Sequence, residues 1–320
     1  MTHLALSVLF MAVLSAPATA APKVYFVGSL NTSDQFIDSF EGFRSGMAEL
    51  GYRDGENVRY HYYNSRGNDE LLRIATQRLI QDGVDLIVTS STTATVVAAK
   101  ATEGTNIPVL FLSAGNAQKL VKNFSSSGTN LAGISSASVE LTGKRFELLK
   151  ELSPRAKRVA IPLNPKGVNY QTIVAETTDA AGKLGLSITE LHVRSVQDVA
   201  RIAAGITQKH YDAVFQPADS LISEALEPLV SQSIKERLPC IASLLVNVRR
   251  GCLATYAADY VALGRQAAVL ADKILKGTRP ADLPIELPHR LNLIINLKTA
   301  RAIGMAVSKE ILLRADEVIE

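Results

Sequence analysis

The chain has 320 residues, of which 47% are hydrophobic and 20% charged, which is ordinary globular composition at a length that suits two domains. The net charge is +3 at pH 7, basic residues are dispersed among acidic ones, and tryptophan is absent, so the basic arm or stripe of a nucleic-acid-binding protein is excluded. Beyond the N-terminal segment no apolar run approaches the roughly 20 residues of a membrane span, and we expect a protein that is not inserted in a membrane.

The first twenty residues have the pattern of a secretory signal peptide. Residues 4–14 form a short apolar core, and small residues follow in an Ala-x-Ala arrangement that ends at Ala20. An amphipathic core helix is the alternative, but the segment has no polar face. No cysteine follows the apolar core to carry a lipid anchor. We therefore expect cleavage near Ala20, after residues 1–20, and a periplasmic location.

After the leader, short β-rich runs alternate with helical patterns, which is typical of βαβ units and a parallel sheet. The first series predicts strands at 24–28, 58–63, 86–89, 108–112 and 131–134, with helices at 36–50 and 68–82. A helix at 142–152 introduces the second series. Its strands are expected at 158–161, 186–193, 213–216, 240–242 and 253–256, and its helices at 168–184, 196–209, 220–236 and 259–276.

The two series have the same plan and similar length. They predict an α/β fold of two similar, doubly wound parallel-sheet lobes, the first at 21–136 and the second at 137–285. A further strand at 291–297 and a helix from Lys298 form the tail. Because prolines bracket a crossover before this tail, we expect residues 286–320 to return to the first lobe or to the hinge.

Cys240 and Cys252 are the only cysteines of the chain, and they lie on neighbouring apolar runs. In an oxidising compartment an adjacent pair forms a disulfide. Two small buried thiols are an equally weighted alternative. The sequence leaves both open.

No pattern of a catalytic or metal-binding site accompanies these elements. The chain lacks a Gly-x-Gly-x-x-Gly turn after the first strand, a Walker-type loop and a Gly-x-Ser-x-Gly elbow, and its histidines stand singly. Two aspartates follow strands. For Asp34 a helix N-cap is favoured, and for Asp219 a cap and a contact to a ligand ammonium group are weighted equally. We therefore expect no enzyme, no cofactor and no metal site.

Ligands of open parallel sheets bind outside the carboxyl ends of the strands, so the loops after the strands are the candidate site. Their turns are rich in uncharged hydrogen-bonding side chains, such as Asn31 in the first loop. The richest stretch is Thr89 to Thr95, where six of seven side chains carry a hydroxyl. A helix cap requires only one of them, Thr93 or Thr95. The remaining hydroxyls indicate recognition of a small polar molecule.

Six stretches of the chain match a known family. Three are specific: DKILKGTRPADLP at 272–284, IINLKTA at 294–300 and LRADEVI at 313–319. The others lie at 49–58, 142–152 and 158–165. Together they resemble the ABC-transporter substrate-binding family that includes tryptophan- and tyrosine-binding proteins. The resemblance implies a type I periplasmic-binding fold, in which two lobes joined by three crossovers close on one small ligand by hinge motion. It also implies a monomer whose partners are an ABC permease and its ATPase subunit.

Carried over by position, the resemblance implies ligand contacts from loops of both lobes. They are Ser33, Ser91, Thr92, Thr93 and Asn116 from the first lobe, and Asn169, Asp219, Ser220 and Tyr256 from the second. Amino-acid-binding relatives carry an Asp-Pro pair where this chain has Asn116-Ala117, which removes an ammonium partner. The expected ligand is small and polar, amino-acid-like or a carboxylate, and the sequence leaves an organic acid or a sugar open. The alternatives to an import receptor are a sensing module that signals to a membrane receptor kinase and, with less support, an exported α/β enzyme.

Overall fold

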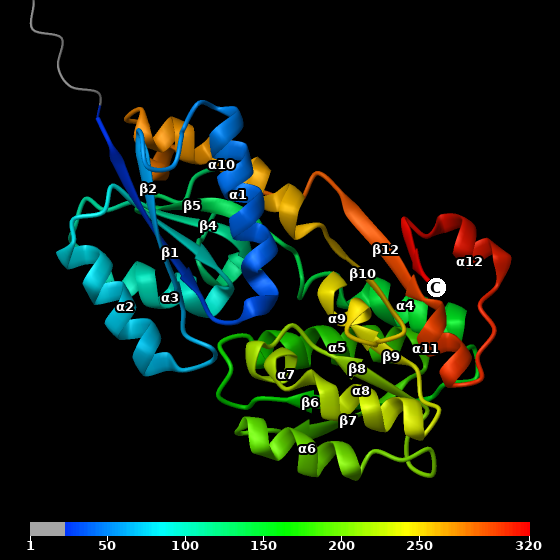
Figure 1. Ribbon diagram of the computed structural model, residues 1–320. Helices are drawn as coiled ribbons and strands as arrows, with labels where there is room; N and C mark the ends of the chain where they lie inside the picture. Colours follow the sequence, from blue (N-terminus) through cyan, green and yellow to red (C-terminus); the bar gives the residue numbers. More distant parts are fainter. Residues whose placement is uncertain (1–22) are drawn as a thin grey trace, which may run out of the picture.

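Two β-sheets with helices on both faces make up the structure, a computed structural model that describes residues 23–320 (Figure 1). The strand order is β11-β5-β4-β3-β1-β2 in one sheet and β13-β12-β10-β9-β8-β6-β7 in the other. We call each sheet with its helices a lobe. The predicted fold class is thereby confirmed. The predicted signal peptide lies outside the described residues.

The first lobe is built mainly from the first half of the chain. Its parallel strands are β1 (Tyr25–Asn31), β2 (Val58–Asn64), β3 (Leu86–Ser90), β4 (Val109–Ala114) and β5 (Leu131–Ser135). Between them lie η1 (Asp34–Phe36), α1 (Ile37–Glu49), α2 (Asp69–Gln81), α3 (Thr92–Ala101) and η2 (Ala117–Lys119). One core forms beneath α1, and another beneath α2 and α3 on the opposite face. Because helices cover both faces, the whole of β3 is apolar or hydroxylic and buried.

The second lobe carries the larger sheet. Its strands are β6 (Arg158–Leu163), β7 (Ser187–His192), β8 (Ala213–Gln216), β9 (Cys240–Ala242), β10 (Ala254–Ala258), β12 (Leu291–Asn296) and β13 (Glu317–Ile319). Its helices are α4 (Thr142–Leu152), α5 (Tyr170–Leu184), α6 (Val196–Ala204), α7 (Ser220–Glu224), α8 (Leu226–Lys235), α9 (Leu245–Arg249), α11 (Leu297–Ala302) and α12 (Lys309–Arg314). Only the β10–β12 pair of this sheet is antiparallel.

The helix predicted at 220–236 is two helices, α7 and α8, which meet at Ala225. Pro228 supplies the reason. A proline inside one continuous helix has no N–H for the carbonyl four residues earlier, here that of Glu224, and its ring collides with that carbonyl. In the first turn of a new helix the missing N–H costs nothing, and Pro228 occupies such a position in α8.

The expectation was that residues 286–320 return to the first lobe or to the hinge. It is wrong for the two strands of this segment, because β12 and β13 pair within the second sheet. The segment that crosses to the first lobe comes earlier: α10 (Tyr260–Leu275), η3 (Pro280–Asp282) and β11 (Ile285–Glu286), which pairs with β5. β12 remains in the second lobe because both of its faces are apolar, with Leu293 and Ile295 in one core cluster and Ile294 in another.

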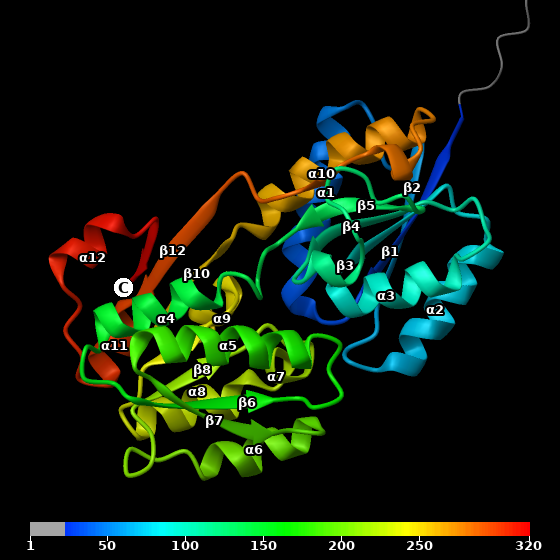
Figure 2. The same cartoon turned by 180° about the vertical axis from the view of Figure 1, so that it is seen from behind.

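Helix α10 lies along α1 on one face of the first sheet, as both views of the molecule show (Figures 1 and 2). Glycines allow this close contact. A Cβ atom at Gly42 of α1 would overlap the carbonyl of Val261, and one at Gly264 of α10 would overlap the carbonyl of Ser39. The two helix backbones therefore touch directly, and this contact fixes α10 to the first lobe.

The buried Arg145 on α4 ties together the segments that join the lobes. It is 0% exposed, and its guanidinium donates to three backbone carbonyls: those of Ser138 on the crossover from β5, Ser243 after β9, and Tyr256 on β10. None of these partners is a carboxylate. Burial without a counter-ion lowers the pKa of Arg145 to about 10, so that the group is still charged at neutral pH.

The two cysteines form a disulfide, which decides between the two alternatives that the sequence leaves open. Cys240 begins β9 and Cys252 lies just before β10, and the bond encloses α9. No helix within residues 23–320 combines the length and the apolar content that a membrane span requires.

Candidate functional site

A cavity of about 700 Å³ lies between the lobes, where the loops after the parallel strands face each other. Its volume falls within the range of small-molecule sites. Both lobes contribute to its wall. The first lobe supplies Thr32, Gln35, Phe36, Ser91, Thr92, Thr93, Ser113 and Tyr260, and the second supplies Asn164, Gly167, Asn169, Arg194, Asp219, Ser220, Leu221 and Ser223. The position agrees with the expectation for doubly wound sheets.

The hydroxyl row at Thr89–Thr95 divides into a structural part and a part at the cavity. Ser91 caps α3, because its Oγ accepts from the N–H of Ala94 at 3.2 Å; the prediction of Thr93 or Thr95 as cap is wrong. Thr95 bonds to the Ser91 carbonyl and to the Thr89 hydroxyl, and both threonines are fully buried. Ser91, Thr92 and Thr93 line the cavity.

Ser91 has a φ of +105°, a backbone conformation that is unfavourable for a residue with a side chain. Such strain is concentrated at functional sites, where the surrounding structure over-determines it. Here it turns the chain sharply from β3 into α3. The turn keeps the first residues of α3 at the cavity wall.

Thr92 joins three loops. Its Oγ1 accepts from the backbone N–H of Asn116 at 3.2 Å and from Nδ2 of Asn169, on the other lobe, at 3.5 Å. Asn169 is 8% exposed, and its Oδ1 atom is buried without a partner in the part of the chain that the structure describes. The Asn116 side chain donates across the lobes to Thr172 at 3.1 Å. Asn169 thus retains a free acceptor at the cavity.

Asp219 is the helix cap that the sequence offers as one of two roles, and its contact with a ligand ammonium group stays a prediction. Its Oδ1 caps α7 by accepting from the N–H groups of Leu221 and Ile222, and the residue also lines the cavity. A Cβ atom added to Gly167 would lie 2.6 Å from the Oδ2 atom of Asp219. Any residue larger than glycine at position 167 would therefore displace the carboxylate. Burial raises the pKa of Asp219 to about 6, against the opposing effect of the two N–H donors.

The structure brings six of the ten predicted ligand residues to the cavity wall: Ser91, Thr92, Thr93, Asn169, Asp219 and Ser220. The other four are placed differently. The Asn31 side chain is buried beside Ser29, to which it donates. Ser33 and Asn116 bond across the lobes, and Tyr256 packs against a core of the second lobe.

Asp34 is not the helix cap that the sequence favours. Ser33 precedes η1 and its hydroxyl accepts from the N–H of Gln35. The Asp34 carboxylate instead accepts from Nδ2 of Asn64, at the end of β2, at 2.6 Å.

The ligand residues predicted from the sequence do not include the two aromatic residues of the wall. Phe36 and Tyr260 line the cavity, and their rings meet edge to face with centroids 5.9 Å apart. Phe36 directly follows the first polar loop, so its position was a usable signal. No such signal marks Tyr260 in the sequence, because this residue reaches the first lobe only through the crossover of α10. Gln35 and Arg194 were also missed.

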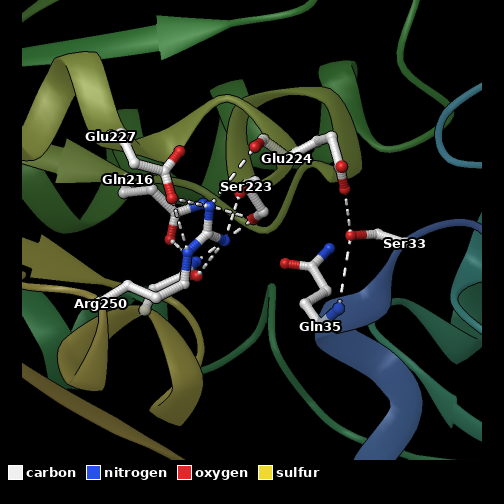
Figure 3. Close-up of polar contacts among 8 residues, drawn as sticks. Ser33, Gln35, Gln216, Ser223, Glu224, Glu227 and Arg250 are labelled. Carbon is white, nitrogen blue, oxygen red and sulfur yellow. Dashed lines mark hydrogen bonds and ion pairs between the residues drawn. The ribbon is translucent and has the colours of Figure 1, made fainter.

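Among the described residues, four hydrogen bonds connect the lobes around the cavity. Two lie close together in sequence on the first lobe. Thr32 bonds with Ser220 at 3.3 Å. Ser33 donates to Glu224 at 2.5 Å, and Figure 3 shows this second bond. The others are the Asn169–Thr92 and Asn116–Thr172 bonds described above. The lobes are therefore in direct polar contact at the cavity.

A family model and one named relative both match this chain over most of its length. The model of a family described as ABC transporter substrate binding protein matches residues 31–319. The tyrosine-binding protein of Clostridioides difficile (strain R20291) is 29% identical over 269 residues, which cover 83% of this chain and 76% of that protein.

Two solved structures resemble this chain, one with a bound ligand and one without. The ABC domain from Streptococcus pneumonia in complex with L-Trp has a TM-score of 0.84 at 27% identity, covering 93% of this chain and 100% of that one. A ligand-free, open substrate-binding protein with adhesive properties from Clostridium difficile has a TM-score of 0.68 at 26% identity, covering 92% of this chain and 99% of that one.

Proposed function

Because the chain belongs to the ABC transporter substrate-binding protein family, we propose that it is a periplasmic receptor for an aromatic amino acid. In this proposal the two lobes enclose the ligand, and the closed protein delivers it to a membrane permease driven by an ATPase subunit. The observation that carries the ligand class is the wall of the cavity, where an aromatic pair lies among groups that suit both ends of an amino acid.

The polar part of the wall offers partners of both charges. The hydroxyls of Ser91, Thr92 and Thr93 surround the N-terminus of α3, where backbone N–H groups and the helix dipole favour a carboxylate. Asp219 offers a carboxylate oxygen to the ammonium group of the ligand. This carboxylate would take the place of the aspartate that amino-acid-binding relatives carry at the position of Asn116. These assignments agree with the relatives, one named for tyrosine and one solved with L-Trp.

The apolar part suits an aromatic side chain. Phe36 and Tyr260 present two rings, and Leu221 and Leu244 also line the cavity. Aromatic rings pair favourably edge to face or offset, so a third ring from the ligand would extend the existing Phe36–Tyr260 contact.

The arrangement of the lobes supports closure around the ligand. At nearly equal identity, the chain is closer to the L-Trp complex than to the open, ligand-free relative, with TM-scores of 0.84 and 0.68. The four hydrogen bonds between the lobes are contacts that an opened cleft would break. We infer that the lobes open and close by hinge motion at the segments that Arg145 holds together.

Calorimetric titration of the mature protein with tyrosine, tryptophan, phenylalanine, an organic acid and a sugar tests this function. We expect saturable binding of at least one aromatic amino acid, together with compaction in solution scattering. Binding of only the sugar or the organic acid, or of none of the five, would refute the proposed ligand class. Cell fractionation and co-purification of a permease test the location and the transport partner.

A further inference from the structure

Gln35 has a buried side chain whose amide has no hydrogen-bond partner among residues 23–320. The residue is 7% exposed, it lines the cavity, and neither Nε2 nor Oε1 bonds to any of these residues. Figure 3 shows the amide pointing from η1 toward α7, and the only dashed line that reaches the residue ends at its backbone nitrogen. A buried amide left unpaired on both atoms is destabilising, and native proteins rarely retain one without a reason.

Ser33 and Ser223, which Figure 3 draws together with Gln35, already have hydrogen-bond partners of their own. The Ser33 hydroxyl donates to Glu224 and accepts from the backbone N–H of Gln35. The Ser223 hydroxyl accepts from Nε2 of Gln216 and from Nδ2 of Asn247. Neither hydroxyl bonds to the Gln35 amide, which is left available to a molecule inside the cavity.

The chemistry of an amide limits what that molecule presents. Nε2 donates and Oε1 accepts, so a hydroxyl group, which also donates and accepts, can satisfy both atoms. An indole N–H can satisfy only Oε1, and a plain phenyl ring satisfies neither. Phe36, the next residue in the chain, brings an aromatic ring to the same wall.

We propose that Gln35 is a specificity-determining residue that recognises the phenolic hydroxyl of a tyrosine-like ligand. The inference rests on the proposed function, because it takes an aromatic amino acid as the occupant of the cavity. In the bound state the phenol donates to Oε1 and accepts from Nε2, while the ring lies by Phe36 and Tyr260. Selectivity then follows from the unpaired amide that remains when the ligand lacks the hydroxyl.

The experiment compares tyrosine and phenylalanine binding by calorimetry in the mature wild-type protein and in Gln35→Leu. We expect the wild type to prefer tyrosine by roughly tenfold or more. In Gln35→Leu the tyrosine affinity falls to that of phenylalanine, whose own affinity changes less than about threefold. Gln208→Leu, an exposed glutamine after α6, is the control and keeps the wild-type preference.

Thermal unfolding separates recognition from a structural role. Removing two unpaired buried polar atoms should leave the melting temperature of ligand-free Gln35→Leu equal or higher. If Gln35→Leu does not fold, Gln35→Met, which keeps an unbranched side chain, replaces it. An unchanged tyrosine preference in a folded variant, or a wild type that binds both amino acids equally, overturns the role of Gln35. A wild type that binds no aromatic amino acid refutes the proposed function itself.

Discussion

The hydroxyl of Ser33 in the first lobe donates to Oε2 of Glu224 in the second lobe at 2.5 Å, and this bond spans the junction between the lobes (Figure 3). Thr32 and Ser220 form a second contact beside it. Neither Ser33 nor Glu224 lines the cavity. The pair thus stabilises the closed arrangement of the lobes without touching the ligand.

We predict that Ser33→Ala weakens ligand binding by about fivefold, because a hydrogen bond to a charged acceptor contributes roughly 1 kcal/mol when it is partly exposed to solvent. Glu224→Gln should have a similar effect, and the double variant should bind no more weakly than the worse single variant. Calorimetric titration of the four proteins measures this cycle. Additive losses would show that the two side chains act on binding independently.

Arg145 provides a prediction about stability. Arg145→Met removes the donor of three backbone carbonyls that are otherwise buried, and we expect the free energy of unfolding to fall by about 2–4 kcal/mol. Chemical denaturation measures the change. Arg201→Met, which removes an exposed partner of Asp198, is the matched control and should have little effect. Equal stability of the two variants would mean that the carbonyls find other donors.

Two helical glycines, Gly264 at the contact of α10 with α1 and Gly182 in α5, give predictions of opposite sign. Gly264→Ala places a Cβ atom against the backbone of α1 and should destabilise the protein by about 2 kcal/mol or more through overpacking. Gly182→Ala lies in α5 where nothing would contact the new methyl group, and it should stabilise by about 0.5–1 kcal/mol through the higher helix propensity of alanine. A melting temperature of Gly264→Ala that is unchanged or raised would contradict the role of Gly264.

Local patterns predicted most elements of the fold from the sequence. β8, β9 and α4 have the predicted bounds, because each is delimited by clear signals such as the stop of α4 before Pro154. The sequence did not show to which lobe each element belongs. Hydrophobic periodicity shows that α10 and β12 have buried faces but not against which sheet those faces pack. For α10, the sheet is determined by the close contact of Val261 with Gly42 on α1.

The candidate site shows the same division. Polarity after strands indicated the residues whose side chains lie at strand ends, such as Thr92 and Asp219. It gave no indication that Ser33 and Asn116 would bond to the other lobe, because the angle between the lobes decides this. Tyr256 was placed at the site by its position after a strand, but the alternation of β10 directs its side chain to a core.

The raised pKa of Asp219 makes ligand binding depend on pH if its carboxylate receives the ligand ammonium group. Its pKa of about 6 in the free protein lies above the ordinary value of 3.8. At pH 8 the group is ionised, and at pH 5 it is mostly protonated and cannot pair with a cation. We therefore expect affinity about tenfold weaker at pH 5 than at pH 8.

The same pKa shift acts on folding with the opposite sign. The folded, ligand-free protein binds this proton more tightly than the unfolded chain, so the contribution of Asp219 to stability decreases as pH rises from about 4 to 6. Asp219→Asn separates the two effects, because asparagine caps a helix as well as aspartate does. We expect the variant to fold normally, to bind weakly and to lose the pH dependence between pH 5 and 8. Full affinity of Asp219→Asn at pH 8 would show that Asp219 only caps α7 and that the ammonium group is held elsewhere.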